Sequence, residues 1–76
     1  MSPQQLLEFL LQNILEDASV VTVDLRQENE VSILEITAPD EVKGRIIGKS
    51  GRIIKAIRTI VSISFPEQRI IVKVTD

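Results

Sequence analysis

The sequence predicts an α+β domain with the element order α-β-β-α-α-β, in which three helices cover one face of a three-stranded sheet. Helical apolar periodicity near the start and again after residue 51 predicts the two longer helices, and β-rich runs predict three strands. A glycine-bracketed turn at 48–51 separates a short helical pattern from a longer one. With 76 residues, the chain has room for one domain, predicted to span residues 1–76.

The first helix is predicted to begin with a capping box, Ser2-Pro3-Gln4-Gln5. Its wide apolar face consists of Leu6, Leu7, Leu10, Leu11, Ile14 and Leu15. Phe9 falls outside this face. The surplus apolar surface indicates either extra core coverage or a contact with another protein.

Residues 20–26 alternate between apolar and polar, and 31–37 form a second β-rich run, so the two predict a hairpin with its turn at 27–30. Pro39 ends the second strand, and Asp40 is the expected N-cap of a short helix. That helix must end before Gly48.

A third helix is expected from Arg52 to the break at Phe65-Pro66, and residues 69–75 form the last strand. We assign Ile53, Ile57 and Ile60 to the core.

Charge is unevenly distributed although the net charge is only −2. Residues 43–58 contain six cations and no acid, namely Lys43, Arg45, Lys49, Arg52, Lys55 and Arg58. Such a segment predicts a polyanionic partner. The cations of the third helix would also fit a solvated helix face, above all Arg58, which lies farthest from the turn.

The turn Gly48-Lys49-Ser50-Gly51 has the chemistry of a phosphate site. A tight turn exposes the N–H groups that open the following helix, and these attract phosphate together with the helix dipole. Glycine at both ends permits positive φ and close approach of another backbone. Lys49 adds a charge and Ser50 a hydroxyl, while Ile46, Ile47 and Ile54 are expected to offer an aliphatic floor for bases.

The stretch I-I-G-K-S-G-R-I-I, preceded by V-K-G-R, resembles the core motif of the KH domain, whose G-x-x-G loop holds about four nucleotides. The element order resembles the type II arrangement, and length and layout resemble the small stand-alone bacterial KH proteins of the KhpA family. The motif core runs over 39–58, with the loop at 48–51. The resemblance implies the RNA-binding residues Lys43, Gly44, Arg45, Ile47, Gly48, Lys49, Ser50, Gly51, Arg52 and Lys55.

The resemblance also implies single-stranded RNA as the ligand, with single-stranded DNA left open, and a cytoplasmic post-transcriptional regulator or RNA chaperone. Base preference is expected from backbone edges of the second strand. The resemblance further implies that the chain pairs, either as a homodimer or with a larger KH protein of the KhpB, or Jag, type. The alternative is a KH-fold dimerisation module that acts mainly through a protein partner.

The composition excludes or disfavours several classes of protein and of functional site. Without Cys or His, the chain lacks the residues of disulfide scaffolds, zinc sites and Cys- or His-centred catalysis, and we expect neither enzyme activity nor a cofactor. A P-loop needs four residues between its glycines, whereas Gly44 and Gly48 enclose three. With Phe9 and Phe65 as the only aromatics, base stacking of the RRM or OB-fold kind is disfavoured. No apolar run is long enough for membrane insertion.

Overall fold

The computed structural model describes residues 1–75 and confirms the predicted element order. Its elements are α1 (Pro3–Ile14), β1 (Thr22–Glu28), β2 (Val31–Thr37), α2 (Asp40–Ile47), α3 (Arg52–Ser64) and β3 (Arg69–Val74). Two 3₁₀ turns join them, Ala18–Val20 and Lys49–Gly51. The first was not predicted: it takes up Val20, which sequence periodicity assigned to the first strand, so β1 begins two residues later.

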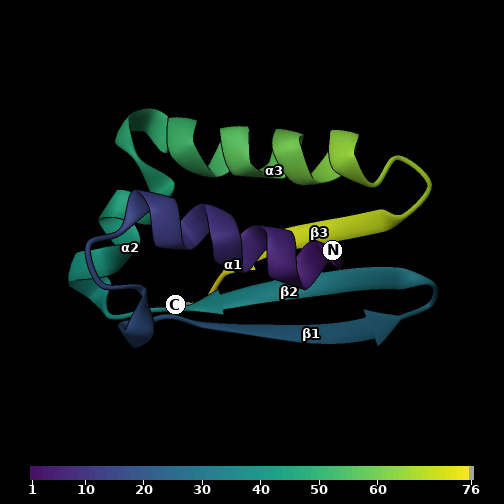
Figure 1. Ribbon diagram of the computed structural model, residues 1–76, viewed down its shortest axis with the longest axis horizontal. Helices are drawn as coiled ribbons and strands as arrows, with labels where there is room; N and C mark the ends of the chain where they lie inside the picture. Colours follow the sequence, from purple (N-terminus) through teal and green to yellow (C-terminus); the bar gives the residue numbers. More distant parts are fainter. Residues whose placement is uncertain (76) are drawn as a thin grey trace.

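The sheet has the strand order β1-β2-β3, with β1 antiparallel and β3 parallel to the central β2. The three helices lie on one face of it (Figure 1). A two-residue turn joins β1 to β2, and both of its residues, Asn29 and Glu30, have positive φ, as the right-handed twist of a tight hairpin favours. The central strand is therefore paired on both sides, whereas β1 and β3 each keep a free edge.

The core lies between the helices and the sheet, and all its fully buried members are apolar. Leu34 and Ile36 of β2 are completely buried, as are Leu7 of α1 and Ile46 of α2. The remaining buried side chains are Leu11, Leu15, Val23, Ala38, Ile54, Ile57, Val61 and Val72. Because α3 contributes Ile54, Ile57 and Val61 to it, this core fixes the helix that follows the glycine turn.

The capping box of α1 is confirmed, because the Gln5 N–H donates to Ser2 Oγ at 3.1 Å and the Ser2 N–H donates to Gln5 Oε1 at 2.9 Å. The prediction that Asp40 caps α2 is wrong. Pro39 occupies the N-cap position and fixes the chain there, so Asp40 becomes the first helical residue. Ile60 was also assigned wrongly to the core: it is 38% exposed, because the core-facing stripe of α3 passes through Ile54, Ile57 and Val61.

The face of the sheet away from the helices is charged. Glu35 in the centre of β2 lies 3.5 Å from Lys73 of β3 and 3.9 Å from Arg26 of β1. These cross-strand pairs place charge on the open face, beside the apolar pair Ile33 and Ile71, of which Ile71 is 50% exposed. Among residues 1–75, no helix is both long and apolar enough to cross a membrane.

Leu34→Ala is expected to lower the free energy of unfolding by about 2–5 kcal/mol, because it empties a fully buried site at the centre of the sheet. Leu25→Ala is the matched control. Leu25 is the register partner of Leu34 on β1 but is 46% exposed, so the free energy of unfolding should fall by only about 1 kcal/mol. Urea unfolding followed by circular dichroism measures both. Equal losses would contradict the described core.

Candidate nucleic-acid interface

The turn between α2 and α3 is built on left-handed backbone. Gly48 has φ +76°, Ser50 +58° and Gly51 +73°. Positive φ at three of four consecutive residues reverses the chain within one 3₁₀ turn, so that α3 starts immediately beside the end of α2. This agrees with the expectation that glycine at both ends permits positive φ.

The two glycines are required for different reasons. A Cβ on Gly48 would lie 2.6 Å from Ile53 Cγ1, so Ile53 occupies the space that a side chain would need. At Gly51 the nearest atom would be Ile54 Cγ2 at 4.0 Å, so only the positive φ restricts this position. Gly48 thus allows the first turn of α3 to pack directly against the loop.

The loop leaves backbone donors open at the start of α3. The Gly48 N–H donates to Gly44 O at 2.9 Å, the Gly51 N–H donates to Gly48 O at 3.1 Å, and the Arg52 N–H donates to Lys49 O, so these three close the turn itself. No side chain caps α3, whose N-cap is Gly51. The first-turn N–H groups of a helix have no partners within it, and they carry the positive end of its dipole. Beyond Arg52, the N–H groups of Ile53 and Ile54 are therefore positioned to receive an anionic oxygen.

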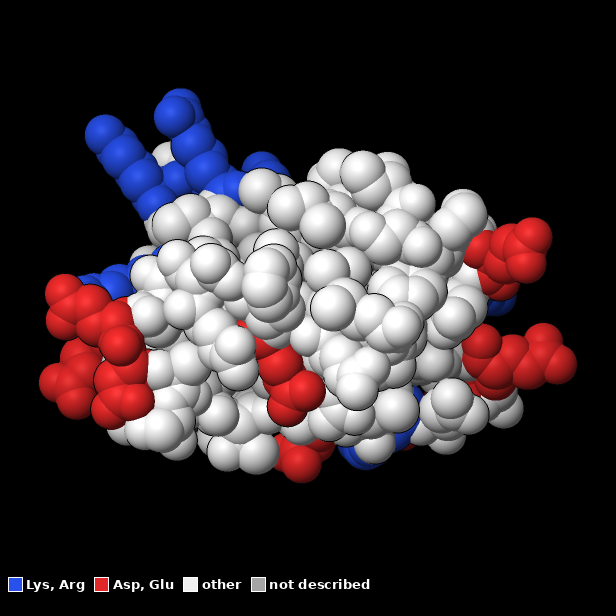
Figure 2. Space-filling model, viewed as in Figure 1, with Lys and Arg blue, Asp and Glu red and all other residues white. Residues whose placement is uncertain are grey.

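Three predicted cations surround this helix start. Lys49, Arg52 and Lys55 are all exposed, and within residues 1–75 none of them forms a salt bridge. Figure 2 shows Lys and Arg side chains projecting from the end of the molecule that holds the loop between α2 and α3. Their charges add to the field of the helix N-terminus.

Two other predicted site residues face elsewhere. Lys43 pairs with Asp40 at 3.3 Å, and its side chain is only 16% exposed. Arg45 lines a pocket whose charged neighbours are carboxylates. Gly44 lies inside α2 with no atom within 4 Å of an added Cβ and without a positive φ, so the fold does not require glycine there. The six-cation segment is thus divided between the loop and the far side of α2.

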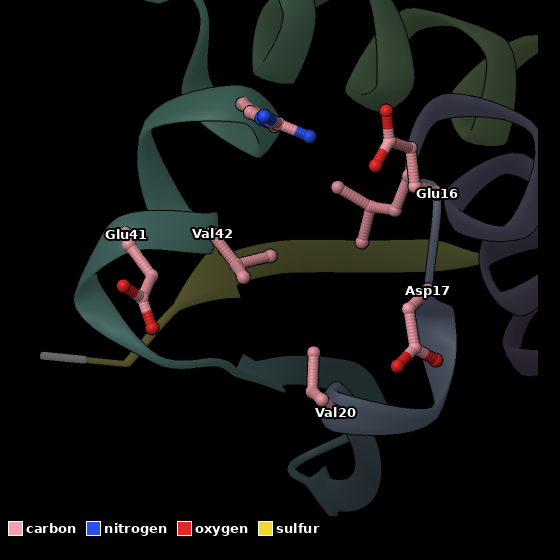
Figure 3. A pocket seen from close by; sticks show the side chains of 7 residues that line it. Glu16, Asp17, Val20, Glu41 and Val42 are labelled. Atoms are coloured by element: carbon pink, nitrogen blue, oxygen red, sulfur yellow. The ribbon is translucent and has the colours of Figure 1, made fainter.

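The acidic pocket lies between α2 and the segment that follows α1 (Figure 3). Its volume is about 370 Å³, with Glu16, Asp17 and Glu41 at its rim and Leu15, Val20 and Val42 among its lining residues. The Ser19 hydroxyl and backbone N–H donate to Asp17 and lower the pKa of its carboxyl, which therefore stays ionised at neutral pH. Carboxylates at this rim repel phosphate, so the pocket is unsuited to nucleic acid.

The expected aliphatic floor is only partly present. Ile46 is fully buried and Ile54 is 6% exposed, so both belong to the core, because α2 and α3 turn these residues toward the sheet. Ile47, at the end of α2, is 38% exposed and is the one member of that trio within reach of a ligand.

An open groove does lie beside α3, along the edge strand β3. Its volume is about 390 Å³, and it is lined by Arg58, Val61 and Ser62 of α3 and by residues 70–73 of β3. The expectation that the second strand offers its backbone edge to bases is wrong, because β2 is paired on both sides. The free edge next to α3 belongs to β3. Sequence reasoning missed it, since only the sheet order shows which strand is at the edge.

The comparisons with known proteins agree with this geometry. Residues 4–75 match the family model described as "KhpA/KhpB, KH domain". The chain belongs to this family. RNA-binding protein KhpA of Clostridium perfringens is 38% identical over 58 residues, which cover 76% of this chain and 77% of that protein. RNA-binding protein KhpA of Leifsonia xyli subsp. xyli is 33% identical over 70 residues, 92% of each chain.

Solved structures share the fold of this chain at greater distance. The model matches a chain of Era, crystallised with MgGDPNP and nucleotides 1506–1542 of 16S ribosomal RNA, with a TM-score of 0.63 and 16% identity. The match covers 96% of this chain and 30% of that chain. This likeness concerns the fold alone, and the KH assignment of this chain rests on the family model.

Gly48→Ala is expected to cost more stability than Gly51→Ala, because it adds a clash with Ile53 to the strain of positive φ. Strain alone is worth about 1–2 kcal/mol at Gly51, which is in the αL conformation, and more at Gly48, whose ψ of 173° lies in a region that is essentially restricted to glycine. The Gly48 variant should lose about 1–3 kcal/mol beyond that, as overpacking does. Thermal unfolding of both variants gives the order, and a larger loss at Gly51 would contradict the described packing.

Proposed function

We propose that this chain binds single-stranded RNA, holding about four nucleotides between the Gly48-Lys49-Ser50-Gly51 loop and the groove along α3 and β3. The observation that carries the proposal is the left-handed loop at the uncapped N-terminus of α3, in a chain of the KhpA/KhpB family. Two relatives named above are described as RNA-binding proteins.

Phosphate contacts supply the affinity in this mechanism. A phosphate accepts hydrogen bonds from the open N–H groups at the loop, with Lys49 and Ser50 beside it. Arg52 and Lys55 follow on the exposed side of α3 and meet neighbouring phosphates. With three cations neutralising about three phosphates, log affinity should fall against log salt with a slope of about −2, at about −0.7 per phosphate.

Base contacts come from two places. Exposed Ile47 offers an apolar surface at the mouth of the loop, and the α3–β3 groove offers the backbone edge of β3. An aliphatic and backbone surface of this kind needs no aromatic platform, which fits a chain with only two Phe residues. A site this short binds weakly as a single copy, and a regulator or RNA chaperone of this design gains from being paired.

The Lys49→Asp, Ser50→Asp double variant is expected to lose RNA binding at least about tenfold, because two carboxylates then face the phosphate at the loop. Fluorescence anisotropy with a labelled single-stranded RNA octamer, at several salt concentrations, measures the loss. The DNA octamer of the same sequence, run in parallel, tells whether the ligand class includes single-stranded DNA.

Gln68→Asp with Arg69→Asp is the matched control, since it changes the net charge by the same −3. Both control residues are exposed; Gln68 lies just before β3 and Arg69 is its first residue, at the opposite end of α3 from the loop (Figure 1). If the two double variants weaken binding equally, attraction is diffuse and the loop mechanism is wrong.

We also propose that the chain associates with a second copy of itself, or with a larger KH protein of the KhpB type, through the outer side of α1 and α3. Phe9 of α1 is 52% exposed, and Ile63 of α3 is 70% exposed. The two helices pack against each other, and the face that Figure 2 presents is largely uncharged over them. Phe65, the other aromatic, is half-buried and contributes less to this surface.

Ile63→Glu should shift the chain to the monomer in sedimentation velocity at micromolar concentration, because a carboxylate would be buried in the contact. Val20→Glu is the control, an exposed apolar side chain outside both helices. The proposal is contradicted if the wild-type chain remains a monomer when it is alone and also when it is mixed with a KhpB-type partner.

A further inference from the structure

Arg58 joins α3 to the free edge of the sheet. Its Nε donates to the Val72 carbonyl oxygen at 3.0 Å, across the groove that the two elements line together. Within residues 1–75, the rest of its guanidinium forms no salt bridge and no other hydrogen bond. One side of this planar group is therefore fixed on the backbone, and its other N–H donors stay available in the groove.

The bond also shows which backbone groups of β3 face outward. Successive residues of a strand direct their N–H and C=O groups to opposite edges. Since Val72 O accepts from Arg58, the polar groups of Val72 and Ile70 face the groove. The Thr75 N–H, which donates to Ile36 O on β2 at 2.8 Å, has the opposite direction and agrees with this alternation.

At Val72, the free edge of β3 therefore presents the guanidinium donors of Arg58 at the place where a carbonyl acceptor would otherwise be exposed. A bare strand edge offers an N–H and a C=O, which together match the acceptor N1 and the donor N6 amine of adenine. Here the Val72 carbonyl is already occupied, and the Val72 N–H lies beside the guanidinium. At Val72 a base therefore meets the N–H of the strand and the free guanidinium N–H groups, while one lone pair of the Val72 carbonyl is already used by Arg58.

We infer that Arg58 is a specificity-determining residue of the RNA site, which makes the α3–β3 groove select bases with two adjacent acceptors. Guanine has such a pair in O6 and N7, and cytosine in N3 and O2, whereas adenine places its amine between N1 and N7. On the Watson–Crick edge of uracil, an N–H separates the acceptors. The inference rests on the proposed function, because it concerns the bases that follow the phosphate at the loop.

The position of Arg58 on its helix fits this role. It lies about 9 Å along the axis from Arg52, at 1.5 Å per residue, and so beyond the phosphate at the loop. Buried Val61 and Val72 flank it in the same groove. A hydrogen bond in such partly enclosed surroundings discriminates better than one in open water.

The test uses uridine octamers that carry adenine, cytosine or guanine at one central position. The wild-type chain should bind the guanine and cytosine octamers about tenfold more tightly than the adenine octamer. Arg58→Met frees the Val72 carbonyl and removes the guanidinium donors. The affinity for the guanine octamer divided by that for the adenine octamer should therefore fall to about one or below. Arg58→Lys keeps the charge without the planar group; its ratio should fall while the salt slope stays near the wild-type value.

The inference is overturned if the wild-type chain binds the guanine and adenine octamers with equal affinity. It is also overturned if both Arg58 variants keep the wild-type preference for guanine. Loop-dependent binding would still stand in that case. Undiminished binding by the Lys49→Asp, Ser50→Asp variant instead removes the proposed RNA site itself, and the inference with it. Thermal unfolding checks that each Arg58 variant is folded at the assay temperature. If Arg58→Met is unfolded there, Arg58→Lys alone is compared with the wild type.

Discussion

The contact between Gly48 and Ile53 is the constraint on which the rest of the site depends. Because Ile53 fills the space of a missing side chain, α3 can begin directly against the loop, and its Ile54, Ile57 and Val61 then reach the core over the sheet. The same arrangement leaves the helix start uncapped and exposed. One steric requirement thus joins the packing of the domain to the exposed donors at the start of α3.

Charge in this molecule is separated by α2. Within the described residues 1–75, Lys49, Arg52 and Lys55 form no salt bridge, whereas Arg45 lies among the carboxylates of the acidic pocket and Lys43 is paired with Asp40. A run of six cations in the sequence therefore becomes a much smaller positive region in three dimensions. The acidic pocket repels a polyanion from the other side of the helix, so the electrostatic field favours approach at the loop.

The sheet order decides which backbone groups the domain leaves unpaired within residues 1–75. Had β3 been central, its backbone would be fully paired and only side chains could contact a base. As an edge strand beside α3 it offers N–H and C=O groups, and Arg58 changes what that edge presents. The same free edge is a risk for association with other strands, and a long cationic side chain fixed on it reduces that risk.

Sequence alone determined the elements, the loop and the class of ligand. Periodicity located the helices and strands, Gly48 and Gly51 located the left-handed turn, and the absence of Cys and His removed whole classes of chemistry. These features are local, so a linear pattern contains them. Tertiary structure decided which side chains are accessible: Ile46 and Ile54 became core, Ile60 became surface, and Lys43 and Arg45 turned from the loop. It also decided that β3 has the free edge and that Arg58 crosses to it, because strand order and contacts between residues 14 positions apart arise only when the helices pack on the sheet.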